Sequence, residues 1–120
     1  MGCDIYLHVE VKIGDKWEHY SSCDVCRSYN LFAKMANVRN REGIIPIDEP
    51  RGLPSDISKE TSTHYESWGT DAHSASFLTA QEVVELEGWV KEQGYPNEFF
   101  RNLFESNRTS DFRFVFWFDN

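Results

Sequence analysis

Residues 4–13 read DIYLHVEVKI, and their apolar and polar side chains alternate without interruption. The apolar face consists of Ile5, Leu7, Val9, Val11 and Ile13. The opposite face consists of Asp4, Tyr6, His8, Glu10 and Lys12. Because successive side chains of a strand point to opposite faces, this period of two predicts a β-strand with one buried face.

A second segment with the same period lies near the other end of the chain, where residues 111–118 read DFRFVFWF. Its phenylalanines share one face, and Arg113, Val115 and Trp117 share the other. Aromatic side chains suit the pleated surface of a sheet, so we interpret the phenylalanines as core. A stacking platform for nucleic acid would need cations beside the rings, and this strand carries only Arg113.

Helix signals lie between these two strands. Thr79-Ala80-Gln81-Glu82 fits a capping box, which predicts a helix to Gln93 with Gly94 just past its end. Ser28 is a suitable cap for a helix to Asn37. The remaining expected elements are a Gly14-Asp15 turn into a strand at 16–20, an irregular loop at 38–54, a short polar helix at 55–66, an irregular segment or short strand at 73–78, and a helix opened by Pro96.

Terminal strands with helices between them predict an α+β fold. Its antiparallel sheet includes both terminal strands, and helices pack on it. The length of 120 residues and mass of 14.0 kDa predict that residues 1–120 form a single domain.

The composition narrows the classes of function. A charged fraction of 27% and the lack of a long apolar run favour a soluble protein without a membrane span. The net charge of -8 argues against direct binding of nucleic acid, and the excess of acid falls entirely within residues 46–120. The start of the chain lacks the features of a signal peptide, and an odd count of three cysteines suggests reduced thiols, so a cytoplasmic location is expected.

Cys23-Asp24-Val25-Cys26 is a lone CxxC motif. Zinc requires four ligands, so two closely spaced cysteines supply half a site. The redox form of the motif belongs in a βαβ setting, which this sequence lacks. We therefore predict no metal and no cofactor.

Trp68-Gly69-Thr70-Asp71-Ala72-His73-Ser74-Ala75-Ser76 concentrates an acid, an imidazole and hydroxyl groups just before a predicted helix. This composition suits a ligand-binding or catalytic loop. The alternative is a turn whose side chains satisfy backbone groups.

The polar face of the first strand is a second candidate. Asp4, Tyr6 and His8 follow one another at two-residue spacing, and they either line a pocket or face water. His19 and His64 have no pattern around them and are expected on the surface. A glutamate-rich helix face is either solvated or meets a basic partner; it comprises Glu82, Glu85, Glu87 and Glu92.

The order and spacing of several segments resemble a family of small proteins of unknown function found in bacteriophage genomes and phage-bearing bacteria. That family begins Met-Gly-Cys-Asp-Ile-His and ends Phe-Trp-Phe-Asp-Asn; here Tyr6 and His8 are exchanged relative to its start. The segments that carry the resemblance are 1–5, 30–33, 38–40, 49–54, 68–76 and 116–120. The resemblance implies a phage context and supplies no activity.

The matched segments are polar and lie at the termini and in loops, so we expect them to converge at one edge of the sheet. Arg51 would then be the cation for an anionic group, with hydroxyls helping, which suits a phosphate-containing small molecule. The predicted ligand-binding residues are Asp4, His8, Arg51, Asp71, His73, Ser74 and Ser76.

These observations lead to three hypotheses. The first is a phage accessory protein, with a role against host defence, that binds a nucleotide-like small molecule or a host protein in the bacterial cytoplasm. The second is a small hydrolase or nucleotide-processing enzyme with His73 as base and Asp71 or Asp4 orienting it. The third is an acidic mimic of nucleic acid. The sequence leaves the oligomeric state open.

Overall fold

The computed structural model describes residues 2–94 and 111–119. Strands and helices follow the order β1, β2, α1, α2, a 3₁₀ turn, β3, α3 and β4. The strands are β1 (Asp4–Ile13), β2 (Lys16–Cys23), β3 (His73–Thr79) and β4 (Phe112–Asp119). The helices are α1 (Tyr29–Ala36), α2 (Lys59–Trp68), the turn η1 (Gly69–Asp71) and α3 (Ala80–Glu92).

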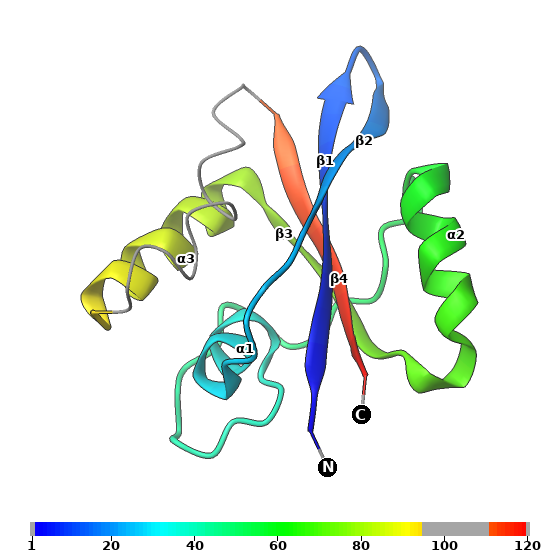
Figure 1. Cartoon of the computed structure of the whole chain (residues 1–120). Coiled ribbons are helices and arrows are strands. Elements are labelled where there is room, and N and C mark those ends of the chain that lie inside the picture. The colour runs from blue at the N-terminus through cyan, green and yellow to red at the C-terminus, as the bar shows by residue number, and fades with distance from the viewer. Residues whose placement is uncertain (1, 95–110, 120) are drawn as a thin grey trace.

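The four strands form one antiparallel sheet in the order β2-β1-β4-β3. The two terminal strands are its central pair, with Ile5 opposite Phe118 and Val9 opposite Phe114 (Figure 1). The prediction of an α+β fold with both terminal segments in one antiparallel sheet is confirmed.

Helices α1 and α3 cover the face that carries the phenylalanines of β4 (Figure 1). Ser28 caps α1, and Thr79 and Glu82 form the predicted capping box of α3. The core between helices and sheet includes Ile5, Leu7, Val9, Leu31, Phe32, Met35, Leu78, Val83, Leu86, Phe114, Phe116 and Phe118. Burial of these apolar side chains is the main source of stability for the sheet.

Helix α2 covers the opposite face, on the other side of the sheet from α1 and α3 (Figure 1). The prediction that β1 is only half-buried is therefore wrong in its central part, because His8 is 4% exposed and Glu10 is fully buried. Trp117 on β4 is also fully buried on this side. The polar face of β1 escapes water because α2 brings its own hydrogen-bonding groups to it.

The other boundaries differ in detail from the sequence expectations. Strand β2 continues to Cys23, and the polar helix runs from Lys59 to Trp68. The segment at 73–78 is a strand with a bulge, where Ser74 takes a φ of 55°. The loop at 38–54 contains neither helix nor strand, as predicted. The helix expected at Pro96 lies outside the described residues. No helix in the described part of the chain has the length and apolar character to cross a membrane.

Candidate ligand-binding site

A buried ion pair fixes α2 onto the sheet. Arg113 on β4 donates to Glu10 Oε1 from Nε at 2.9 Å and from Nη2 at 2.7 Å. The other carboxylate oxygen accepts from the Ser58 backbone N–H and the Thr61 hydroxyl, each at 2.9 Å. Burial raises the pKa of Glu10, but hydrogen bonds from Ser58, Arg113 and Thr61 outweigh it and leave the pKa below its usual value. The carboxylate is therefore charged and fully paired.

Three imidazoles form a chain beside this ion pair. His8 Nε2 lies 2.8 Å from His64 Nδ1, and His8 Nδ1 lies 3.0 Å from His19 Nε2. Ser22 Oγ is 3.1 Å from His8 Nδ1. The chain thus joins β1, β2 and α2 through one buried ring at its centre.

The indole of Trp68 sets the direction of this chain. Trp68 Nε1 is a donor only, and it lies 3.2 Å from His64 Nε2. When the rings are uncharged, His64 must therefore carry its proton on Nδ1 and donate to His8 Nε2. His8 then donates from Nδ1 toward His19 Nε2 and Ser22 Oγ.

The central imidazole is held uncharged at neutral pH. Burial, with a smaller effect of the neighbouring His19 and His64 rings, lowers the pKa of His8 to about 4. A charged His8 would carry a proton on Nε2, which faces the proton on His64 Nδ1. His64 cannot move its own proton to Nε2, because that nitrogen accepts the hydrogen bond from the Trp68 indole. The central ring of the chain is consequently neutral.

A cavity of about 320 Å³ opens against this chain, at the low end of the range for small-molecule sites. His8 and His64 line it together with Ser22. The remaining lining residues are Asp4, Ile5, Tyr6, Leu7, Cys23, Asp24 and Val25. The lining thus combines imidazole rings, hydroxyls and carboxylates with apolar side chains.

Asp4 and Tyr6, two polar residues that line the cavity at the start of β1, are hydrogen-bonded to other protein side chains. The Asp4 carboxylate takes a bidentate pair of hydrogen bonds from Arg27, both at 2.9 Å, which lowers its pKa. The Tyr6 hydroxyl donates to Asp119 at 2.9 Å, and burial together with this bond raises the pKa of Tyr6 to about 12. The Tyr6 ring packs on Trp68 at a centroid distance of 4.4 Å. The cavity therefore has a rigid wall.

The structure brings together only some of the residues predicted to form a site. Asp4 and His8 line the same cavity. Arg51 and Ser76 meet at β3, where the Arg51 backbone N–H donates to the Ser76 hydroxyl at 3.0 Å. His73 lies opposite Phe118 and packs on its ring, on the α1 side of the sheet, so it does not reach His8.

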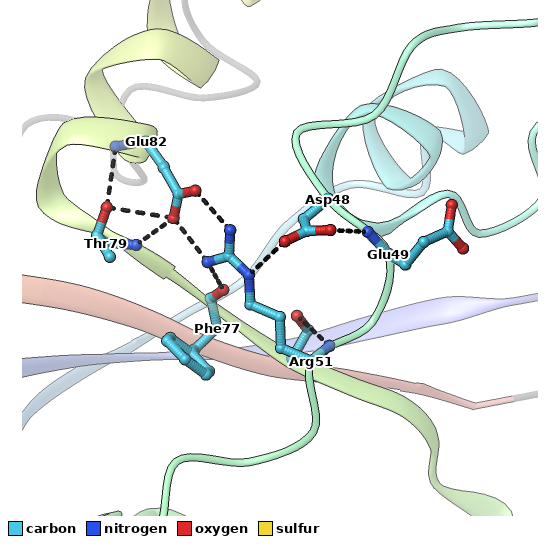
Figure 2. Close-up of polar contacts among 7 residues, drawn as sticks. Asp48, Glu49, Arg51, Phe77, Thr79 and Glu82 are labelled. Atoms are coloured by element: carbon cyan, nitrogen blue, oxygen red, sulfur yellow. Dashed lines mark hydrogen bonds and ion pairs between the residues drawn. The ribbon is translucent and has the colours of Figure 1, made fainter.

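Arg51 is not available as a cation for a ligand. Its guanidinium lies between Glu82 and Asp48, and it also donates to the Phe77 carbonyl at 3.0 Å (Figure 2). The Arg51 guanidinium and the Thr79 cap lower the pKa of Glu82 to about 2. The residue thus clamps the loop at 48–53 to β3 and the start of α3.

This clamp changes the outcome expected for an Arg51 variant. We expect Arg51→Met to lower the free energy of unfolding by about 1–3 kcal/mol, because it removes charge-assisted hydrogen bonds to a partly buried carboxylate. Asp48→Ala, which leaves the Glu82 contacts in place, should cost less than about 1 kcal/mol. Urea unfolding measures both; an unchanged midpoint for Arg51→Met would show that the clamp adds no stability.

Ser74 and Asp71 lie near His73 without forming a triad with it. His73 Nδ1 is 3.0 Å from Ser74 Oγ, and His73 Nε2 is buried with no hydrogen-bond partner. Asp71 is exposed in η1, and no hydrogen bond links its carboxylate to another described residue. The pair has the chemistry of a nucleophile and a base, but no described acid orients the imidazole.

The three cysteines differ in solvent exposure. Cys3 is buried, Cys23 is half-buried and Cys26 is exposed. Within residues 2–94 and 111–119, no group of three or more histidine, cysteine or acidic side chains has an arrangement that would hold a metal ion. The three imidazoles themselves contact one another in line rather than facing a common point.

His19 and His64 are the site residues that sequence reasoning missed. A turn at Gly14-Asp15 places His19 opposite Glu10, on the polar face of the sheet. The position of His19 could therefore have been predicted from the register of this hairpin. His64 belongs to a stripe with helical spacing that faces the sheet, made of Thr61, His64, Tyr65 and Trp68. Its polar character hides it from a search for apolar periodicity.

No protein-family model matches this chain, and comparison with curated proteins and with solved structures finds no match.

Proposed function

We propose that the protein acts by binding, and that it holds a small nucleotide-like molecule in the His8 cavity. The observation that carries this proposal is the cavity of about 320 Å³ at the imidazole chain. Its imidazoles and the Ser22 hydroxyl lie beside a Tyr6 ring that contacts Trp68 and donates to Asp119. A planar heterocycle can pack against such rings, with the Ser22 hydroxyl near its edge.

Binding fits these groups better than catalysis does. A general base needs a pKa near the working pH, whereas the pKa of His8 is lowered to about 4. Both nitrogens of His8 are already engaged by neighbouring imidazoles. The chain is thus poorly suited to accept a proton from a ligand.

The phage context implied by the resemblance suggests a biological role for this binding. A small protein that sequesters a host nucleotide signal would counteract a defence that depends on that signal.

Titration calorimetry with adenosine, guanosine, cytidine and uridine tests the proposal. We expect at least one nucleoside to bind, and Ser22→Leu to weaken its affinity by at least about tenfold, because the longer side chain fills the cavity. Ser55→Leu makes the same change at an exposed position away from the cavity and should keep the affinity. Equal affinity in wild type and Ser22→Leu would place binding elsewhere.

The same samples distinguish the enzyme hypothesis. A binding protein returns the nucleoside or nucleotide intact, as chromatography of the mixture would show. Turnover that disappears in His73→Ala would instead support the hydrolase built on His73 and Ser74, which are within hydrogen-bonding distance.

A further inference from the structure

We infer that the protein has a second site, for phosphate groups, formed by Arg39 and Arg41 on the ring of Tyr29. The guanidinium carbons of Arg39 and Arg41 lie 5.4 Å and 5.9 Å from the centre of that ring. A guanidinium held against an aromatic ring keeps its N–H groups free to bind an anion. This site is inferred independently of the His8 cavity.

The two arginines differ from the other arginines that the structure describes. Arg27, Arg51 and Arg113 each bind a carboxylate through at least two hydrogen bonds. In the described part of the chain, neither Arg39 nor Arg41 forms an ion pair. Their charges are therefore uncompensated in a chain whose net charge is -8.

The surrounding sequence favours an anion as the ligand. Residues 25–41 contain Arg27, Lys34, Arg39 and Arg41 and no aspartate or glutamate. The first turn of α1, where Tyr29 lies, also lacks an acidic residue. Burial, Asp119 and Asp4 raise the pKa of the Cys3 thiol and Arg39 and Arg27 act to lower it, so the potential of Arg39 reaches the end of β1. The excess of positive charge within residues 25–41 attracts anions to this segment.

The loop that carries the two arginines is already ordered. The Asn40 side chain bonds the Ile44 N–H at 3.0 Å, the Ile44 carbonyl at 2.6 Å and Asn37 Oδ1 at 2.8 Å. The Tyr29 hydroxyl is fixed by the Cys3 N–H at 3.2 Å. A preorganised loop and ring lower the entropic cost of holding a ligand.

Phosphate is the anion that this arrangement fits best. Guanidinium groups match the tetrahedral oxygens of phosphate with paired N–H donors, and two such groups suit a pyrophosphate better than a single carboxylate. The expected ligand class is therefore a small phosphorylated molecule.

Calorimetry with inorganic pyrophosphate as the probe tests the site. We expect wild type to bind pyrophosphate and the double variant Arg39→Ala/Arg41→Ala to lose at least about tenfold in affinity. Binding should also weaken as salt rises from about 0.05 to 0.5 M, because exposed charges are screened. Tyr29→Phe, which keeps the ring, should retain binding.

The control is Lys16→Ala/Lys59→Ala, which removes the same charge at two exposed positions away from the Tyr29 ring. Its affinity for pyrophosphate should stay within about twofold of wild type. An equal loss in both double variants, or no binding by folded wild type at millimolar pyrophosphate, would overturn the inference. Because pyrophosphate lacks a base, these results are separate from the nucleoside test of the His8 cavity.

Discussion

Replacing Arg113 with alanine should lower the free energy of unfolding by about 3–5 kcal/mol. The change leaves Glu10 fully buried without its counter-charge, and it also removes the bonds from Arg113 to Asp56 and the contact of the guanidinium with the Trp17 ring at 4.1 Å. Urea unfolding at neutral pH gives the loss from the midpoint and slope.

Two further variants separate the ion pair from a general effect of losing charge. Lys91→Ala removes the exposed side of a 3.7 Å ion pair with Glu87 on α3 and should cost less than about 0.5 kcal/mol. Glu10→Gln/Arg113→Met should cost less than the sum of its single variants, since each change relieves the unpaired charge left by the other. A loss below about 1 kcal/mol in Arg113→Ala would show that water, together with the Ser58 and Thr61 hydrogen bonds, compensates the charge of Glu10.

The central sheet could be predicted because its signals are local. The alternation in β1 and the phenylalanines of β4 define their core faces without any knowledge of the partner strand. The capping box of α3 is likewise formed by residues close together in the sequence, Thr79 and Glu82. Each of these features depends on the period of the backbone, which is the same wherever the element is placed.

The location of α2 could not be predicted by the same means. Its stripe of Thr61, His64, Tyr65 and Trp68 binds the sheet through hydrogen bonds and ring contacts rather than through a continuous apolar face. Polar partners recognise each other only after the tertiary fold has brought them together. The sequence therefore suggested that Glu10 faced water, although Arg113 lies directly opposite it in the β1–β4 register.

In the candidate site, too, residues with a local signal could be predicted and contacts that depend on the tertiary fold could not. Asp4 and His8 were found because they share a face of one strand, and both line the cavity. Arg51 was expected to bind an anion because the polar segments of the chain were expected to converge at one edge of the sheet. Its partners Glu82 and Asp48 come from a different helix and from its own loop, so their ion pairs appear only in the folded chain.

Acidification from about pH 6.5 to about pH 4 should remove up to about 3 kcal/mol of stability through His8 alone. In the folded chain the pKa of His8 is lowered from 6.5 to about 4, chiefly by burial. Within this window the unfolded chain binds a proton at His8 and the folded chain does not, so stability rises with pH. Glu10 and Glu82, whose pKa values are lowered below 4.5, add their own loss at the acidic end.

The slope of stability against pH isolates His8 from these carboxylates. Urea unfolding between pH 5 and 7 should show the slope in wild type, and His8→Gln should flatten it even though the variant is less stable overall. His73→Gln is the matched control, since His73 lies on the opposite face and contacts none of the three imidazoles of the chain. If wild type and His8→Gln lose stability in parallel over this range, His8 is charged in the folded protein. The imidazole chain directed by Trp68 would then be wrong, because a charged His8 donates from both nitrogens and cannot accept from His64.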